Sequence, residues 1–586
     1  MSIKLSQKDF DQGTLRLTQP GTYVLTENIV FAPNKGYNYF PRSQQKDYSA
    51  PAYGLGFFAA ITIEVDHVTL DLQGHHIACS QVFSIQQRFF AIIELASAPF
   101  IPGQGPADFG QKVTYANHCV IKNGSLGRSS HHGIHGNNNT DITIMRLTIT
   151  DYEVAGIALN GFTGVTIENV RIGAPSQQCF VNGRYSAARF LSIAGRQWLQ
   201  KHGKKCSDAR KNKFLKHLSR VEQEMSQVLS SVSQGGPPCP HNYFVNHEVN
   251  GTYPPDGNTY ALLFHSKGVA IHDFEQLSSL SESEFSRELT IRSVSIHDVK
   301  IRATETVTLT DHQGVPLTDF SGSVFPILEC VDKFSTTGKI SSRATYQHTD
   351  LSKAQIYGHL MGLEAGVPFG RSNFSQYFLN WVFQERSFSY LSLKNHQVIC
   401  NGDDMFHVQK GLCGIRVDGV KKVVMDDVVF DTLINMAPLG DTSGGSYQLS
   451  HPKSNQKGYC ACDLVAVNLS ACVGVSLNDV RIRKLHSYNG DCCGVRIMNG
   501  SSGVSFTKCN INGMKVGYIE KNGIWYGQDA YGNQIPYQTN YPNQFPVIYG
   551  VRYLQVDDHE GLPSNENLQM KNLDGINDLV HKISLS

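Results

Sequence analysis

Residues 142–149 read ITIMRLTI, with apolar side chains at the first, third, sixth and eighth positions. The same eight-residue pattern recurs along the chain, in copies that begin at Val165, Leu289, Val423, Val475 and Val504. An apolar-x-apolar run predicts a short strand with one buried face, because successive side chains of a strand point to opposite sides. The two residues between the runs shift this alternation, as a tight bend does, and they are often Asp, Asn or Ser. Each copy therefore predicts two strands joined by a bend.

A third strand that opens with glycine accompanies several copies: GIALNG starts at residue 156, GIRVDG at 414 and GVRIMNG at 494. Three short strands and their bends make a coil of roughly 20–25 residues, and Val165 follows Ile142 by 23 positions. One coil cannot bury its own apolar face, whereas stacked coils can, because each strand pairs with its counterparts above and below. The pattern thus predicts an all-β, right-handed parallel β-helix solenoid with a helical insertion and an irregular C-terminal tail.

The six copies and the glycine-opened strands resemble the pectin-lyase-like superfamily of right-handed parallel β-helices. The resemblance covers about residues 60–180 and 265–515, with interruptions. It implies a fold and no particular activity, because function resides in sites that are built on folds.

The pattern and its interruptions divide the chain into segments. We expect an N-terminal cap at 1–60, β-helix at 61–182, a helical insertion at 183–242, β-helix at 243–300, a second insertion at 301–395, the last coils at 396–516 and an aromatic-rich tail at 517–586. Helical spacing of apolar residues supports the first insertion, at Phe214, Leu218, Val221, Met225 and Val228. Residues 196–220 carry nine Lys or Arg against one acidic residue, Asp208. This basic stretch is interpreted as a solvated helix face or as a docking surface for an acidic partner.

Composition narrows the classes of partner. The formal net charge of +1 gives no global attraction to nucleic acid or to an anionic membrane. The first residues lack the apolar core of a signal peptide, and no apolar run is long enough to span a membrane. We therefore expect an intracellular or virion-associated protein whose 14 cysteines are mostly reduced. Cysteine spacing typical of zinc sites is missing, so neither a metal nor a cofactor is expected.

The segment SSHHGIHGNNNTD at 129–141 gathers three histidines. Aligned with the coil that follows, Ile134 points into the core, His135 points outward, and His131 and His132 lie in the preceding bend. Three interpretations remain. The histidines form a structural turn, they supply a general base or a substrate contact, or they join His75, His76, Asp151 and Glu153 in a metal site. We select His131, His132 and His135 as substrate-binding candidates without a metal.

Fragments elsewhere resemble the motifs of polygalacturonases. NGDDMFH at 401–407 resembles their Gly-Asp-Asp stretch, NTD at 139–141 their first acidic motif, and GVRIMN at 494–499 their Arg-Ile-Lys motif, with Met498 in place of Lys. The resemblance implies catalytic candidates at Asp403, Asp404, His407 and Arg496. In that family the first two motifs lie on neighbouring coils, whereas here Asp141 and Asp403 are 262 positions apart. Adjacent Asp403 and Asp404 also suit a turn, where carboxylates bind backbone amides.

The aromatic tail adds Trp525 and Tyr526, which we select as further substrate-binding candidates. Aromatic rings there suit sugar stacking, an inter-subunit arm, or a loop that covers the solenoid.

Two classes of function remain. The first is a non-enzymatic structural or surface-assembly protein, such as a particle or virion component, that forms a homo-oligomer or a larger assembly. The second is a protein that binds or cleaves a polysaccharide as a glycoside hydrolase or lyase, which would need two carboxylates, or a base and a cation, on one face. The missing motif spacing favours the first, and the outward His, Asp and Arg residues favour the second. Enzymatic activity is left open.

Overall fold

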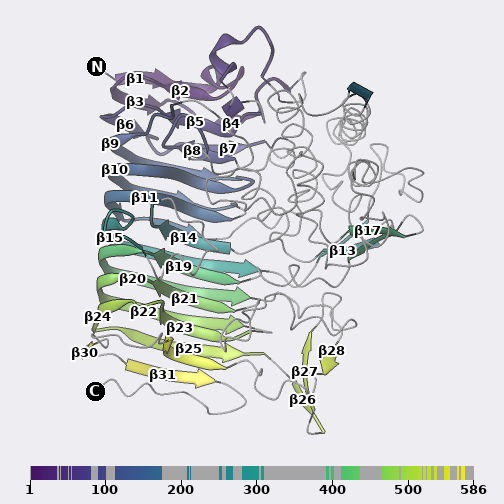
Figure 1. The fold of residues 1–586 in the computed structure, drawn as a ribbon, viewed down its shortest axis with the longest axis vertical. Coiled ribbons are helices and arrows are strands. Elements are labelled where there is room, and N and C mark those ends of the chain that lie inside the picture. The colour runs from purple at the N-terminus through teal and green to yellow at the C-terminus, as the bar shows by residue number, and fades with distance from the viewer. Residues whose placement is uncertain are drawn as a thin grey trace.

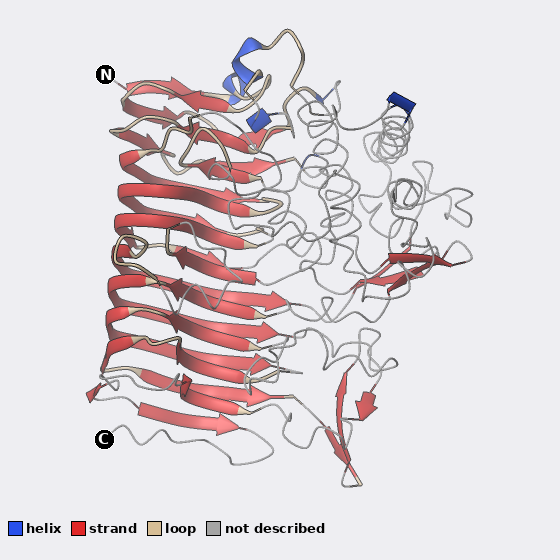
Figure 2. Ribbon diagram, in the orientation of Figure 1, coloured by secondary structure: helices blue, strands red, loops and turns tan. Residues whose placement is uncertain are grey.

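The chain is a right-handed parallel β-helix whose strands stack along the long axis of the molecule (Figure 1). The computed structural model describes, with short gaps, residues 2–80, 90–99, 112–173, 259–267, 280–301, 411–435, 463–487, 490–517 and 547–554, and several shorter segments. Figure 2 shows that strands predominate among these residues. The prediction of an all-β solenoid is confirmed.

Each coil contributes one strand to each of three parallel sheets, and the long strands continue through a bend from one sheet into the next. The first sheet contains β2 (Leu15–Leu17), β5 (Ala59–Ile63), β8 (Ala91–Glu94), the starts of β10 (His132–Ile149) and β11 (Ala155–Glu168), β14 (Thr259–His265), β19 (Leu412–Asp418), β21 (Leu464–Ser470), β23 (Cys492–Met498) and β29 (Ile548–Leu554).

The second sheet contains β1 (Ser2–Leu5), β3 (Gly21–Leu25), β6 (Val68–Asp71), the start of β9 (Asn117–Gly127), the middle of β10, the end of β11, the starts of β15 (Ser286–Ile301), β20 (Val420–Asn435) and β22 (Val473–Ser487), β24 (Ser502–Thr507) and β30 (Ser564–Glu566). The third contains β4 (Ile29–Phe31), β7 (His76–Cys79), β12 (Arg171–Gly173), β25 (Asn510–Val516), β31 (Gln569–Asp574) and the ends of β9, β10, β15, β20 and β22.

Bends between the second and third sheets occur where the eight-residue pattern predicts them. The second of the two intervening residues has a positive φ in every copy, at Arg146, Asn169, Ser293, Asp427, Asp479 and Lys508. Such a left-handed residue turns the chain sharply, and Asn and Asp tolerate it better than most side chains do. The inward residues on either side are 0–3% exposed, for example Ile144 and Leu147. Full burial of such a side chain contributes about 1.5–3 kcal/mol.

Close approach inside the coil explains why strands of the first sheet open with glycine. A Cβ on Gly133 would lie 2.5 Å from the carbonyl oxygen of Gly156 in the next coil and 2.8 Å from Ile149 Cγ2. A Cβ on Gly414 would lie 2.6 Å from the carbonyl oxygen of Ala466, and a Cβ on Gly494 would lie 2.5 Å from that of Gly550, in each case in the next coil. The glycines therefore make room between the first sheet and the side chains of the third.

The solenoid extends beyond its expected bounds at both ends. Strands β1 to β4 pair in register with β3, β5, β6 and β7, so the first coil already lies within the segment expected as an N-terminal cap. Strands β29, β30 and β31 add a coil within the segment expected as an irregular tail. Among the described residues of the tail, β26 (Ile519–Lys521), β27 (Ile524–Gln528) and β28 (Gln534–Pro536) lie outside the solenoid sheets and form an antiparallel sheet.

The insertions fall largely outside the described residues. Of 183–242 only Asp208, Ala209 and Asn212 are described, and the expected helical insertion is not supported, since no helix of seven or more residues occurs in the described part. The second insertion is described only where β16 (Glu305–Thr308) pairs with β13 (Asn250–Tyr253) and β17 (Leu391–Lys394) pairs with β18 (Gln397–Cys400). A search of the described residues finds no helix with the length and apolarity needed to cross a membrane.

Candidate functional site

The outer face of the first sheet carries a column of mostly polar side chains. We call it the outer column. From one end of the solenoid to the other it consists of Arg16, Thr62, Glu94, His135, Ala158, Leu263, Arg416, Asn468, Arg496 and Arg552. Strands β14, β19 and β21 are buried on both faces, so this outer face is covered as well as the inner one. Buried polar groups need partners, and the structure supplies them.

Glu94 and His135 are neighbours on the outer column. His135 Nδ1 lies 2.8 and 3.0 Å from the two carboxylate oxygens of Glu94, and the Asn160 amide nitrogen lies 3.2 Å from His135 Nε2. These contacts suit an imidazole that donates from Nδ1 and accepts at Nε2. Burial raises the pKa of the Glu94 carboxyl, although the contact with His135 opposes this shift. His135 is 7% exposed and Glu94 is 1% exposed, so the pair is held inside the protein.

The other two histidines of the segment stack beside this pair. The His132 ring stacks on the His135 ring with centroids 5.1 Å apart, and the His131 ring lies 3.9 Å from that of His132. The three histidines therefore do form a cluster, as the sequence indicates. His135 points away from the coil interior, as expected, but His132 and His135 are buried and do not face solvent.

Two of the residues that the metal interpretation would add have other side-chain partners. His76 contacts Ser125 on the third sheet, and Asp151 contacts Arg128. Glu153 lies outside the described residues. Within the described part of the chain, no three His, Cys, Asp or Glu residues are grouped to hold a metal ion.

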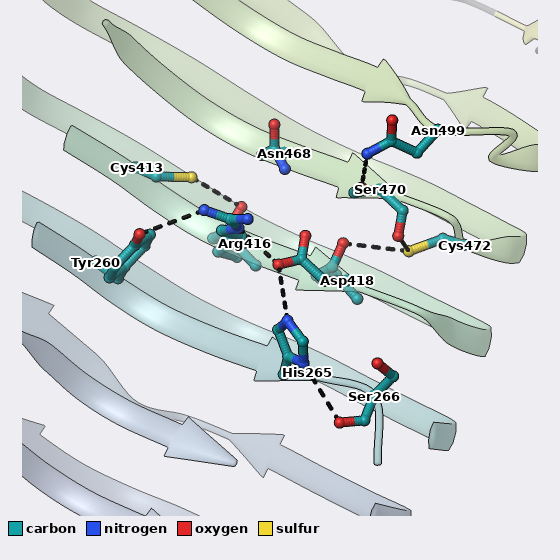
Figure 3. A network of polar contacts seen from close by, with 12 residues as sticks. Tyr260, His265, Ser266, Cys413, Arg416, Asp418, Asn468, Ser470, Cys472 and Asn499 are labelled. Atoms are coloured by element: carbon teal, nitrogen blue, oxygen red, sulfur yellow. Dashed lines mark hydrogen bonds and ion pairs between the residues drawn. The ribbon is translucent and has the colours of Figure 1, made fainter. Parts of the chain in front are cut away.

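A second buried network lies further along the same face (Figure 3). Arg416 Nε donates to Asp418 Oδ2 over 2.7 Å, and His265 Nε2 lies 3.6 Å from the same oxygen. Arg416 Nη1 also reaches the Tyr260 hydroxyl at 3.4 Å. Asp418 is fully buried and His265 is 1% exposed. Burial lowers the pKa of His265, and the nearby Asp418 carboxylate opposes that shift. Asp418 thus balances the charge of a buried arginine.

In the last coils, arginines of the outer column also pair with buried or partly buried aspartates, but each aspartate belongs to the preceding coil. Arg496 donates to Asn468 Oδ1 at 2.7 Å and to Asp463 Oδ2 at 3.0 Å, and Arg552 donates to Asp491 Oδ2 at 2.9 Å. Each aspartate precedes a strand of the first sheet, and its other oxygen accepts a backbone N–H from the next coil. Burial and the adjacent Asp491 carboxylate raise the pKa of Asp463 to about 8, while Arg496 opposes the shift.

An apolar cluster lies on the same face and shares Ala158 and Leu263 with the outer column. It contains Ala155, Ala158, Tyr260, Leu263, Cys413, Val465 and Cys493. Cys413 and Cys493 occupy one column, two coils apart, and each precedes the glycine that opens its strand. Both are free thiols, and burial raises the pKa of each to about 12. They act here as small apolar side chains and not as nucleophiles.

Of the sequence-predicted site residues, the three histidines lie together, whereas Arg496 lies apart from them. Arg496 and His135 share the outer column but lie five coils apart, or about 24 Å at the usual strand spacing. Asp403, Asp404 and His407 lie outside the described residues. Trp525 and Tyr526 lie on β27, of which only the backbone is described.

Asp141, from the fragment that resembles an acidic motif, occupies a bend. It is exposed, has a φ of 53°, and contacts His118 at 3.0 Å.

The sequence analysis did not identify the carboxylates that pair with the basic side chains of the outer column. They are Glu94, Asp418, Asp463 and Asp491. The signal for two of them was available, since DLVAVN at 463 and DCCGVR at 491 align with each other. The pairing of Glu94 could not be recognised from a local pattern, because its partner His135 is 41 positions away in the chain.

Comparisons with known proteins assign no family to the chain. No family model matches it, and no curated protein does. Among solved structures, it is similar to the A-module of a mannuronan C-5 epimerase from Azotobacter vinelandii, with 7% sequence identity over 98% of this chain and 86% of that one, at a TM-score of 0.26. A likeness this remote carries no argument about what the chain binds or does.

Proposed function

We propose that the chain is a non-enzymatic structural β-helix that serves as a rigid component of a larger assembly. One observation carries the proposal. Polar side chains on the outer face of the first sheet contact one another within the chain, in the pairs Arg16–Glu64, Glu94–His135, Arg416–Asp418, Arg496–Asp463 and Arg552–Asp491. Each of these pairs is buried or partly buried, which suits groups that fix strand register better than groups that meet a substrate.

The physical role of such pairs is specificity of stacking. Breaking a buried ion pair by removing one partner costs about 3–5 kcal/mol, because the other charge stays buried without compensation. A coil that slipped by one residue would place the pairs that join different coils out of register, since a one-residue shift moves side chains to the other face. Arg416 and Asp418 lie on the same strand, β19, so that pair balances charge and does not depend on the register. The pairs therefore favour one alignment of neighbouring coils along the solenoid.

Cleavage of an extended polysaccharide is a second candidate, and Asp463 is the observation that favours it. Burial and the adjacent Asp491 carboxylate raise the pKa of its carboxyl, which is the direction that suits a general acid. Arg496, one of the sequence-predicted catalytic candidates, lies against it.

One experiment separates the two candidates. The purified full chain is incubated with a panel of uronic-acid and neutral polysaccharides, and released reducing ends and unsaturated products are measured. The structural proposal expects no product with any substrate. Product release by the wild type that is lost in Asp463→Asn would overturn it and support the second candidate. A matched variant on the exposed third-sheet face, Lys515→Glu, controls for general effects of substitution.

A further inference from the structure

The outer face of the second sheet differs from that of the first because its side chains are partly exposed. Its central column contains only Ser, Thr and Val in the described coils from β1 to β24: Ser2, Thr22, Thr69, Val120, Thr143, Thr166, Thr290, Val424, Ser476 and Ser505. These small side chains repeat at the strand spacing of about 4.8 Å and make a flat strip along the solenoid. The flank is flat too where Gly164, Gly474 and Gly503 provide no side chain.

Four exposed charges flank this strip at the seventh and eighth of its ten strands, and we call them the charge quartet. Glu288 and Arg292 lie on either side of Thr290 on β15, and Lys422 and Asp426 lie on either side of Val424 on β20. Within the chain, Lys422 contacts Glu288 at 3.1 Å and Arg292 contacts Asp426 at 3.7 Å. Their side chains are between 43% and 74% exposed. The signs alternate both along the strands and between them.

This alternation makes the charge quartet complementary to itself. A two-fold axis parallel to the solenoid, placed over the strip, sets each flank of one copy opposite the other flank of a second copy at the same height. Glu288 then faces Arg292 of the second copy, and Lys422 faces Asp426 of the second copy. The symmetry generates each contact twice, while Thr290 and Val424 meet their own counterparts near the axis. An isologous contact of this kind closes as a dimer.

The strip is long enough for a specific interface of modest size. Nine strand steps of about 4.8 Å give a length of roughly 43 Å, and three outward columns span roughly 13 Å. The footprint is therefore about 560 Å² on each copy and about 1,100 Å² in total, near the lower limit for specific interfaces. Val473, one of the large apolar residues that is exposed, lies beside the strip and adds apolar area.

We propose that this face of the second sheet is a docking surface for a second copy of the chain, in a parallel two-fold arrangement centred on the charge quartet. The inference rests on the proposed function, because it names the surface and the partner through which the structural role would begin. Since exposed charges carry the orientation, the association weakens as salt is added.

Sedimentation of the full chain tests the proposal. The wild type at low ionic strength is expected to sediment as a dimer of the 64.8 kDa chain. Lys422→Glu places two like charges opposite each other across the axis and should weaken dimerisation at least tenfold. Lys515→Glu makes the same change on the exposed third-sheet face and should leave dimerisation unchanged.

A full inversion of the charge quartet supplies the decisive variant. It combines Glu288→Lys, Arg292→Asp, Lys422→Glu and Asp426→Arg, and it preserves both contacts within the chain and the complementarity between like copies. The inverted chain should dimerise with itself as strongly as the wild type does. It should not exchange subunits with the wild type, because inverted and native flanks repel each other; native mass spectrometry of a mixture measures this.

Three results would overturn the inference: a monomeric wild type, equal effects of Lys422→Glu and Lys515→Glu, or free mixing of inverted and native chains. Failure here is distinct from failure of the proposed function. Polysaccharide turnover would refute the structural role whatever the oligomeric state is. If the chain still associates after Lys422→Glu, and if inverted and native chains mix freely, this surface is not the docking site. That result would not refute an assembly role through another surface.

Discussion

Gly133→Ala tests whether close approach inside the coil determines the glycine-opened strands. The new Cβ would lie 2.5 Å from a backbone carbonyl oxygen of the next coil, about 0.9 Å inside the 3.4 Å at which ordinary contact begins. The obstacle is backbone held in a parallel sheet and cannot rotate away. Overpacking of this kind costs about 1–3 kcal/mol, and a rigid obstacle places Gly133→Ala at the upper end. We therefore expect a loss of about 3 kcal/mol.

Gly164→Ala is the matched control. Gly164 has a φ of +74°, but the nearest atoms to its new Cβ are 3.7 Å away, so that variant carries backbone strain without a clash. Left-handed strain costs about 1–2 kcal/mol. Because solenoid coils open locally, hydrogen exchange of residues 132–137 and 155–160 measures the effect better than a single melting temperature. Protection should fall by more than a hundredfold in Gly133→Ala and by roughly tenfold in Gly164→Ala. Equal losses would refute the argument from close approach.

Two further predictions concern ionisation. Because the pKa of Asp463 is raised to about 8 from its ordinary 3.8, the folded state binds this proton more tightly than the unfolded state. The associated stability is complete below about pH 4 and is lost as the pH rises through about 8. Exchange protection of β21 and β23, corrected for intrinsic rates, should therefore decline between about pH 5 and pH 8 and level off above pH 8, and Asp463→Asn should flatten that decline; an unchanged slope would contradict the assignment. Burial raises the pKa of Cys413 and Cys493 to about 12, so neither thiol should be alkylated at pH 8 until the protein is unfolded. Rapid labelling of the native chain, located by peptide mass spectrometry, would show that this face is open.

The second and third sheets could be predicted because their pattern is local. Alternation over three residues, a bend and a second alternation specify both strands, and the structure places the left-handed residue of the bend at one of the two expected positions in all six copies. The first sheet was harder to recognise. Its strands are buried on both faces, as in TYALLFH at 259–265, so polar and apolar residues do not alternate along them.

The candidate site was predictable only in part for a related reason. The direction in which His135 points follows from coil alignment, but its burial and its partner depend on β8, which is separated from β10 by residues 95–131. Pairing of Arg496 with Asp463 likewise depends on a register between coils that no local pattern reveals. A histidine cluster read without its partners suggests a solvent-facing site, whereas the same cluster with Glu94 in place is a buried contact between strands.

A double-mutant cycle at Glu94 and His135 tests most directly whether the outer column consists of structural partners. Glu94→Leu and His135→Leu each leave a buried polar group without its main partner and should cost about 3 kcal/mol, or more than a hundredfold in local exchange protection of β8 and β10. The double variant extends the apolar cluster formed by Ala158 and Leu263. It should therefore cost less than either single change. Additive costs, or single changes without effect, would contradict the account and would show that these side chains are retained for a purpose other than binding each other.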